Sequence, residues 1–252
     1  MRVLLTNDDG IHAEGLHALR RQFSAFADVC VVAPMQQQSG TAHSITLFHP
    51  LRVRQMRDDG GLYGYAVDGS PADCVKIGVR NLLEHKPDLV ISGINPGGNI
   101  GTNVLYSGTV SAAMEALMLG IPAMAVSIDS FTVKDYSFAA KTAENLARAL
   151  EKNKYPRCLL NVNMPDIEAK KIKGLKLTHQ GNLRFVERYD KRLDPRNESY
   201  YWLDGELIDE ADDPDSDSGA VSRGYVSVTP LGFNLTDNAV MKTAAAMLDE
   251  IR

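Results

Sequence analysis

Short apolar runs alternate with helical patterns along most of the chain. The first run, residues 3–5, begins almost at once and is bounded by turn residues, as a buried strand is. Leu16, Leu19 and Phe23 follow at the spacing of an amphipathic helix. Further strand-like runs lie at 29–33, 88–92, 122–128 and 158–162, and further helical patterns at 71–82, 107–120 and 138–150. This alternation predicts an α/β fold with a Rossmann-like, wound and mostly parallel sheet that has helices on both faces.

Three segments depart from the alternation. Residues 45–53 alternate loosely, and we expect an extended segment or a hairpin there. From about 181 to 219, aromatic residues sit among charges without a helical period, which predicts an extended hairpin arm suited to a subunit interface. A strand at 224–229 and a last helix capped by Asp237 follow. We therefore expect an α/β core at 1–180 that carries the site, a hairpin arm for oligomerisation at 181–223, and a C-terminal strand and helix at 224–252.

Composition narrows the classes of function. The 252 residues are 44% hydrophobic and 23% charged, which is ordinary for a globular protein. The net charge of -5 argues against a nucleic-acid surface, so no stable nucleic-acid binding is expected. The three cysteines are far apart and lie in apolar surroundings, which indicates free thiols in a reducing compartment. Since no run is long enough for a signal peptide or a membrane span, we expect a cytoplasmic protein without membrane contact.

Two adjacent carboxylates, Asp8 and Asp9, follow the first predicted strand. Ligands of open α/β sheets collect at the carboxyl ends of the strands. Adjacent like charges raise each other's pKa unless a cation lies between them, and hard divalent cations prefer oxygen ligands of this type. The pair therefore indicates a metal site, although residues 7–10 (Asn-Asp-Asp-Gly) are equally typical of a turn that caps the next helix.

A segment rich in glycine and asparagine, residues 93–103, follows the strand at 88–92. Its four glycines and three asparagines disfavour helix and strand, and they suit close approach of the backbone to a ligand. A helix then opens at 107–109 (Ser-Gly-Thr), where free N–H groups bind phosphate readily. Ser39 and Asn95 add a hydroxyl and an amide oxygen at the same predicted sheet edge. Because every donor is an oxygen, we expect Mg²⁺, Mn²⁺ or Ca²⁺ beside a phosphate site.

Taken together, these motifs resemble the SurE family of survival proteins. The resemblance runs in order through 7–10 (NDDG), 31–34 (VVAP), 39–47 (SGTAHSITL), 70–75 (SPADCV), 92–110 (SGINPGGNIGTNVLYSGTV) and 224–231 (GYVSVTPL). The sequence departs from the family at Asn103, where aspartate is usual, and at 68–70, where Gly-Thr-Pro is the more usual spelling. Residues 181–219 match poorly.

The resemblance implies a divalent-metal-dependent phosphatase that hydrolyses nucleoside 5′- and 3′-monophosphates to nucleoside and phosphate, with short polyphosphate as a further candidate substrate. It implies one divalent ion, Mg²⁺ or Mn²⁺ in the first place, with the ligands Asp8, Asp9, Ser39 and Asn95. The phosphate contacts that it implies are Asn99, Ser107, Gly108 and Thr109. It also implies homodimers or homotetramers, built with the arm and an exchanged C-terminal segment.

The expected chemistry is attack of water on phosphorus, with Asp8 or Asp9 as the base. A second route makes one aspartate a nucleophile that forms an aspartyl-phosphate, but acids committed to a metal are poorer nucleophiles. The alternative function is a sensor that binds a nucleotide or phosphate without turnover. A full set of four oxygen donors for a metal favours catalysis over that alternative.

Other charged residues have weaker claims to a role. His43, four residues after Ser39, is a candidate proton donor, but a histidine without a partner favours a surface or hydrogen-bonded role. Glu115 is expected to be a surface charge on its helix. The acids of 204–217 include three at calcium-loop spacing, yet the glycine and glutamate that such a loop needs are replaced. A solvated acidic loop is therefore the expectation there.

Overall fold

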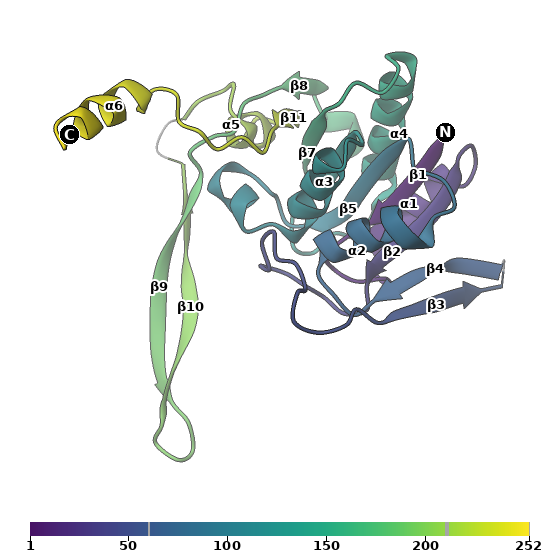
Figure 1. Ribbon diagram of the computed structural model, residues 1–252, viewed down its shortest axis with the longest axis horizontal. Coiled ribbons are helices and arrows are strands. Elements are labelled where there is room, and N and C mark those ends of the chain that lie inside the picture. Colours follow the sequence, from purple (N-terminus) through teal and green to yellow (C-terminus); the bar gives the residue numbers. More distant parts are fainter. Residues whose placement is uncertain (60, 210–211, 252) are drawn as a thin grey trace.

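A nine-stranded sheet forms the centre of the protein, counted over residues 1–59, 61–209 and 212–251, which the computed structural model describes (Figure 1). β1 pairs in parallel with β2 on one side and with β5 on the other, and the parallel order continues through β6 and β7. The order is β3-β4-β2-β1-β5-β6-β7-β11-β8, and β3 and β11 each have an antiparallel neighbour. The strands are β1 (Arg2–Thr6), β2 (Asp28–Pro34), β3 (Val53–Asp58), β4 (Gly61–Val67), β5 (Leu89–Pro96), β6 (Ala123–Asp129), β7 (Leu159–Pro165), β8 (Leu175–Leu177) and β11 (Val226–Leu231). The predicted fold class is confirmed.

Helices cover both faces of this sheet. Because side chains alternate along a strand, Val3 and Leu5 of β1 lie in one core cluster and Leu4 lies in the other. The first cluster contains the apolar stripes of α1 (Glu14–Phe23) and α4 (Ser137–Lys152), and the second contains those of α2 (Pro71–Ile77) and α3 (Gly108–Met118). Short helical turns lie at Gly78–Leu82, Gly101–Leu105 and Ala169–Lys171. Two buried layers of apolar side chains therefore hold the sheet between the helices.

Local signals in the sequence place two of these helices. Ser70 caps α2, because its hydroxyl accepts the Asp73 N–H at 3.1 Å while the Asp73 carboxylate accepts the Ser70 N–H at 3.0 Å. Gly15 allows α1 to lie directly on β5, since a Cβ at that position would be 2.0 Å from the Ile94 carbonyl oxygen. Helix α1 is thus held against the strand that leads into the glycine-rich segment.

Two stretches differ from expectation. Strand β5 continues through Pro96, so the first part of the predicted loop belongs to the sheet. Residues 45–52 lie outside the strands, and β3 begins only at Val53. Helix α2 and its cap bind the start of this stretch, because Asp73 accepts the Thr46 N–H at 3.0 Å and the Ser70 hydroxyl donates to the carbonyl of the preceding Ser44 at 2.6 Å. Side chains thus replace the strand pairing that a hairpin would have provided.

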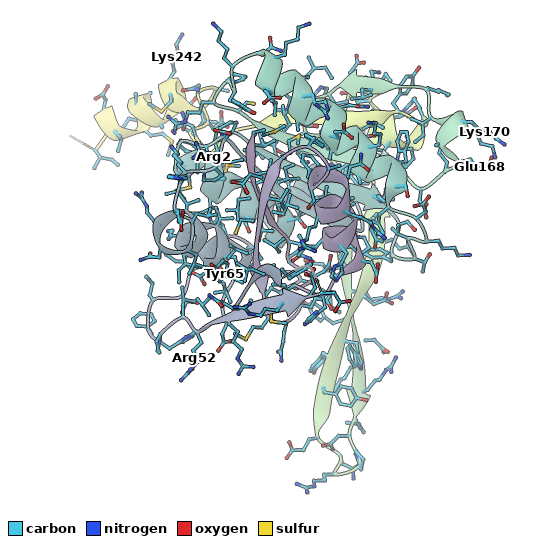
Figure 2. The ribbon with its side chains drawn as sticks, turned by 90° about the vertical axis from the view of Figure 1, so that its right-hand side faces the viewer. Arg2, Arg52, Tyr65, Glu168, Lys170 and Lys242 are labelled. Atoms are coloured by element: carbon cyan, nitrogen blue, oxygen red, sulfur yellow. The ribbon has the colours of Figure 1, made fainter. Side chains whose placement is uncertain are left out.

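A separate two-stranded hairpin projects from the body in both views (Figures 1 and 2). It consists of β9 (Arg184–Leu193) and β10 (Ser199–Ile208), which pair antiparallel. Paired residues share a face, so one face carries ion pairs such as Arg192–Asp190 at 2.8 Å and Arg188–Asp204. The opposite face, called the apolar arm face below, carries Phe185, Tyr189, Leu193, Tyr201, Leu203 and Leu207, with Glu187 and Lys191 among them.

The chain returns to the body after the hairpin and leaves it again at the C-terminal end. Helix α5 (Asp217–Ser222) is mostly buried and packs against β7 and β11. Helix α6 (Met241–Asp249) lies away from the sheet in Figure 1, and none of its residues is buried. Asp237 accepts the Ala239 N–H at 2.9 Å, in the turn before α6 and not at its first residue. Among the described residues, no helix combines the length and the apolar character that crossing a bilayer requires.

Candidate active site

The candidate site lies where the order of the parallel strands reverses. The chain runs from β1 outward to β2, and it later returns to the other side of β1 with β5. Such a switch point opens a crevice at the carboxyl ends of the two strands. Asp8 and Asp9 follow β1, Ser39 follows β2, and Asn95 lies at the end of β5. The fold therefore brings three distant segments to one edge of the sheet.

Five of the predicted site residues line one cavity of about 220 Å³ at this edge. They are Asp8, Ser39, Asn95, Asn99 and Ser107. The remaining three, Asp9, Gly108 and Thr109, are not part of the cavity wall. Thr109 is fully buried and bonds to Asp8, and Asp9 is partly buried next to Asp8 in the chain.

Asp8 is held against the beginning of α3. It is 5% exposed, and its Oδ1 accepts the Thr109 hydroxyl at 2.6 Å. A Cβ on Gly108 would lie 2.6 Å from the Asp8 Cβ, so this approach requires glycine at the first position of the helix. Burial raises the pKa of the Asp8 carboxyl, although the hydrogen bond from Thr109 opposes the shift. The hydroxyl of Thr109 thus positions an acid.

Asp9 has an unpaired buried oxygen. Burial and the neighbouring charge of Asp8 raise the pKa of the Asp9 carboxyl to about 7. Its Oδ2 is buried and has no hydrogen-bond partner among the described residues. A buried acceptor without a donor is costly, and two adjacent acids without a counter-charge are costlier still. The pair therefore fits a cation.

Neutral oxygens complete the donor set. The part of the chain that the structure describes contains no group of three His, Cys, Asp or Glu side chains placed to hold a metal. The Asn95 amide nitrogen donates to the Gly97 carbonyl at 2.6 Å, which leaves its Oδ1 as the free end of the amide. The exposed Ser39 hydroxyl accepts from Gln37 at 2.8 Å. Two carboxylates, an amide and a hydroxyl form an all-oxygen set that suits a hard divalent ion.

The loop that carries Asn99 is anchored by side chains of β6 and β7. The Asn99 amide nitrogen donates to the Ser127 hydroxyl at 2.8 Å, and its backbone N–H donates to Asn163 Oδ1 at 2.8 Å. Its carbonyl accepts the amide groups of Asn161 at 2.8 Å and Asn163 at 3.1 Å. Ser127, Asn161 and Asn163 are fully buried and were not predicted as site residues. Two asparagines at alternate positions of an apolar strand were the available signal, because buried polar groups need partners.

Ser107 begins α3 and faces the cavity. Its hydroxyl oxygen accepts the Val110 N–H at 3.0 Å, so it caps the helix. The hydroxyl hydrogen is not used by that bond, and it can be donated to an anion in the cavity. Ser107 therefore combines a structural bond with a free donor beside the positive end of a helix.

Glu115 is buried, which contradicts the expectation of a surface charge. It is 3% exposed on α3, and its carboxylate contacts His43 Nε2 at 3.0 Å and Lys76 Nζ at 3.3 Å. Burial alone would raise the pKa of Glu115, but the hydrogen bond from His43 and the charge of Lys76 outweigh it and lower the pKa. His43 is thus a hydrogen-bonded histidine, which is the role favoured for it over that of a proton donor. This ion pair ties the segment that carries Ser39 to two helices.

Asp217 is also buried, so the expectation of a solvated acidic loop is wrong at its end. The side chain is fully buried, and its Oδ2 accepts the Gly101 N–H at 3.0 Å. Its Oδ1 accepts the N–H groups of Gly181 at 2.9 Å and Ser218 at 2.8 Å. One carboxylate therefore joins the loop of the candidate site to the base of the hairpin arm.

Comparison with known proteins gives a consistent family. The family model described as "Survival protein SurE" matches residues 3–187. The chain is 48% identical over 244 residues to "5'-nucleotidase SurE" of Syntrophobacter fumaroxidans, covering 96% of this chain and 98% of that protein. It is 48% identical over 252 residues to "5'-nucleotidase SurE" of Syntrophus aciditrophicus, covering 99% and 95%. The crystal structure of the Sure protein from Aquifex aeolicus superposes with a TM-score of 0.85 at 41% identity, over 98% of this chain and 99% of that one.

Asp9→Asn tests whether the acid pair holds a cation. We expect the variant to bind Mn²⁺ more than about tenfold more weakly, because it loses a charged oxygen ligand. The folded-state pKa of Asp9 lies above its ordinary value of 3.8, so its ionisation disfavours folding increasingly as the pH rises from 3.8 to about 7, and fully above that. The metal-free variant should therefore melt about 2–4 °C higher than the parent at pH 8, for a gain of about 1 kcal/mol.

Calorimetric titration with Mn²⁺ and thermal unfolding without metal measure both quantities. Asp166→Asn, at an exposed acid beyond β7, is the matched control and should change neither. Unchanged Mn²⁺ affinity together with a lower melting temperature would show that Asp9 is only a turn residue.

Glu115→Gln tests the buried ion pair. We expect the free energy of unfolding at pH 7 to fall by about 1–3 kcal/mol, because charge-assisted bonds to His43 and Lys76 are lost. Since the folded-state pKa of Glu115 lies below its ordinary 4.5, its contribution is present above that pH and disappears as the pH falls through the lowered value. Urea unfolding of both proteins at a series of pH values measures the difference. Glu168→Gln, which removes an exposed ion pair with Lys170 and Lys171, should leave stability unchanged.

Proposed function

This chain belongs to the SurE family, and we propose that it is a divalent-metal-dependent phosphatase that hydrolyses nucleoside 5′-monophosphates to nucleoside and phosphate. One observation carries the proposal: the carboxylate of Asp8, two hydroxyls and several amides from distant segments line a single cavity at the switch point of the sheet. The names of relatives at 48% identity over nearly the whole chain support the same activity. We extend the proposal to nucleoside 3′-monophosphates and short polyphosphate as further substrates of the same cavity.

We propose that Asp8, Asp9, Ser39 and Asn95 hold one divalent ion, Mg²⁺ or Mn²⁺. The unpaired Oδ2 of Asp9 and the free Oδ1 of Asn95 support this assignment. When bound, such an ion neutralises phosphate oxygens and lowers the pKa of water. Between the two acids, Asp9 is the better proton acceptor, because Asp8 Oδ1 already accepts the Thr109 hydroxyl. An aspartyl-phosphate route stays second, since Asp8 is fixed by Thr109 and both acids face a cation in this assignment.

The phosphoryl group is proposed to lie at the beginning of α3. Ser107 has a free hydroxyl hydrogen to donate, and the first N–H groups of the helix are unpaired within it. Asn99 keeps its second amide hydrogen after bonding to Ser127, so it is a further donor in the cavity wall. Donors that are fixed before the substrate arrives stabilise the charge that develops on the phosphoryl oxygens. Gly108 admits this geometry, because its missing side chain lets Asp8 approach the helix.

A second copy of the chain is the proposed partner, in a homodimer or homotetramer. The apolar arm face is uncovered in this chain, with Tyr189 at 63%, Tyr201 at 57% and Leu203 at 55% exposure. Of the proposed exchanged segment 224–252, helix α6 likewise buries none of its residues, which supports its exchange between subunits, whereas β11 pairs with β7 and β8 of its own chain. The three cysteines are free, which supports a reducing compartment such as the cytoplasm.

Release of phosphate from adenosine monophosphate tests the proposed reaction. We expect turnover with Mn²⁺ or Mg²⁺, loss of turnover on chelation, and recovery when the ion is restored. Asp8→Asn should lower kcat by at least about 100-fold, because it weakens both the ion site and the contact to Thr109. Asp28→Asn, at the amino end of β2, is the matched control and should keep full activity. Binding of the nucleotide without release under any divalent ion would instead favour the sensor alternative.

Substitutions on the two faces of the hairpin test the proposed assembly. Tyr201→Ser with Leu203→Ser removes apolar area from the apolar arm face and should lower the mass measured by analytical ultracentrifugation. Trp202→Ser removes an aromatic side chain that is 59% exposed on the opposite face and should leave the mass unchanged. Far-ultraviolet circular dichroism checks that both variants keep their fold. Equal effects from the two faces would refute the assignment of the interface to the apolar arm face.

A further inference from the structure

Two exposed aromatic side chains stand at the rim of the candidate cavity. Tyr106 and Phe131 line the same cavity as Asp8, Ser39 and Asn95. Their exposed fractions are 62% and 88%, which are high for aromatic side chains. They come from different parts of the fold, since Tyr106 follows the helical turn Gly101–Leu105 and Phe131 follows β6. Two separate elements therefore present apolar rings at the mouth of a polar cavity.

The backbone of Tyr106 is held by hydrogen bonds and the Phe131 ring is held by a packing contact, while both rings stay largely exposed. Tyr106 donates its N–H to the Asn103 carbonyl at 3.1 Å, and its carbonyl accepts the Ala42 N–H at 3.2 Å. The Phe131 ring packs against Gly97, where an added Cβ would lie 2.8 Å from ring atom Cε1. Gly97 also has a φ of +105°, which favours glycine at this position. The structure thus reserves space for the Phe131 ring beside the residue that binds the Asn95 amide.

The cavity has room for the phosphate of a nucleotide but not for the whole molecule. About 220 Å³ suits a phosphate group and an ion, whereas sites for whole organic ligands are typically about 300–1,000 Å³. Apart from Pro96 and glycines, the residues that line the cavity below the two rings carry polar side chains, one of them the carboxylate of Asp8, and these suit a phosphate and an ion better than an apolar base. A nucleoside attached to a phosphate in the cavity must therefore lie across the rim, where the two rings are. Nucleobases stack on aromatic rings regardless of their sequence identity, because every base has a π-face.

We propose that Tyr106 and Phe131 form the nucleobase subsite of this protein. The inference rests on the proposed function, which puts the phosphate of a nucleotide in the cavity. Stacking binds the base and leaves the phosphoryl chemistry to the residues below. It accepts every base, and purines gain most because their larger ring system covers more aromatic surface. The two rings therefore distinguish nucleotides from phosphate esters without a base.

Truncation of each ring tests the subsite by separating the base from the phosphate. In Tyr106→Ala and in Phe131→Ala, the KM for adenosine monophosphate should rise about 5- to 50-fold, because one stacking partner is lost. The inhibition constant of inorganic phosphate should not change, since phosphate does not reach the rings. Tyr106→Phe and Phe131→Tyr keep the aromatic face and should restore the KM of the parent. Phe48→Ala is the matched control, because that ring is 99% exposed and lies outside the cavity wall.

Two results would overturn the subsite. A parallel rise of both constants would mean that the rings support the shape of the cavity and do not bind the base. A change of mass in ultracentrifugation with unaltered affinity for adenosine monophosphate would assign the rings to a contact between subunits. Failure of the parent protein to release phosphate would refute the proposed reaction alone, and the same comparison would then use dissociation constants of adenosine monophosphate and phosphate measured with Mn²⁺.

Discussion

The approach of Asp8 to the first residue of α3 is the contact on which the candidate site depends. It places a carboxylate from the turn after β1 against a helix that lies about a hundred residues later in the chain, and the Thr109 hydroxyl fixes it there at 2.6 Å. The absence of a side chain at Gly108 is what permits the contact. Because Asp8 is immobilised, Asp9 is held beside it in a poorly solvated position, and its pKa rises to about 7. Two acids without a counter-charge are therefore held side by side at the edge of the cavity.

Buried neutral groups support the rest of the cavity. Asn161 and Asn163 bind both the N–H and the carbonyl of Asn99, so the loop is defined by backbone contacts and not only by its own glycines. These amides lie on β7, where Asn163 pairs with Ser127 of β6. Their buried N–H donors would lose their partner if the Asn99 carbonyl moved away, which favours the supported loop conformation over alternatives. Rigid support of this kind is what fixed hydrogen-bond donors need to stabilise developing charge.

The apolar periodicity and the local capping signals of the sequence predict the order of strands and helices. They do not predict which distant segments come into contact. The strand and helix order around β1 and the cap of α2 at Ser70 follow from apolar spacing and from capping chemistry. The length of β5 was underestimated, because glycine and proline are rare in strands and only the pairing with β6 carries them here. Glu115 was misjudged although its helix is apolar on nearly every side, which by itself implies burial and a partner. Its partners His43 and Lys76 belong to other elements, so only the fold identifies them.

The buried carboxylate of Asp217 holds together the loop of the candidate site and the foot of the hairpin. Asp217 binds the N–H of Gly101 in the cavity loop with one oxygen, and with the other it binds the N–H of Gly181 at the foot of the hairpin. The hairpin cannot swing at its foot without stretching bonds that also define the loop. A contact that restrains the foot of the hairpin therefore also restrains the loop of the candidate site, and a contact that restrains the loop also restrains the hairpin. In thermodynamic language the two ends share one coupling free energy, which is reciprocal by necessity.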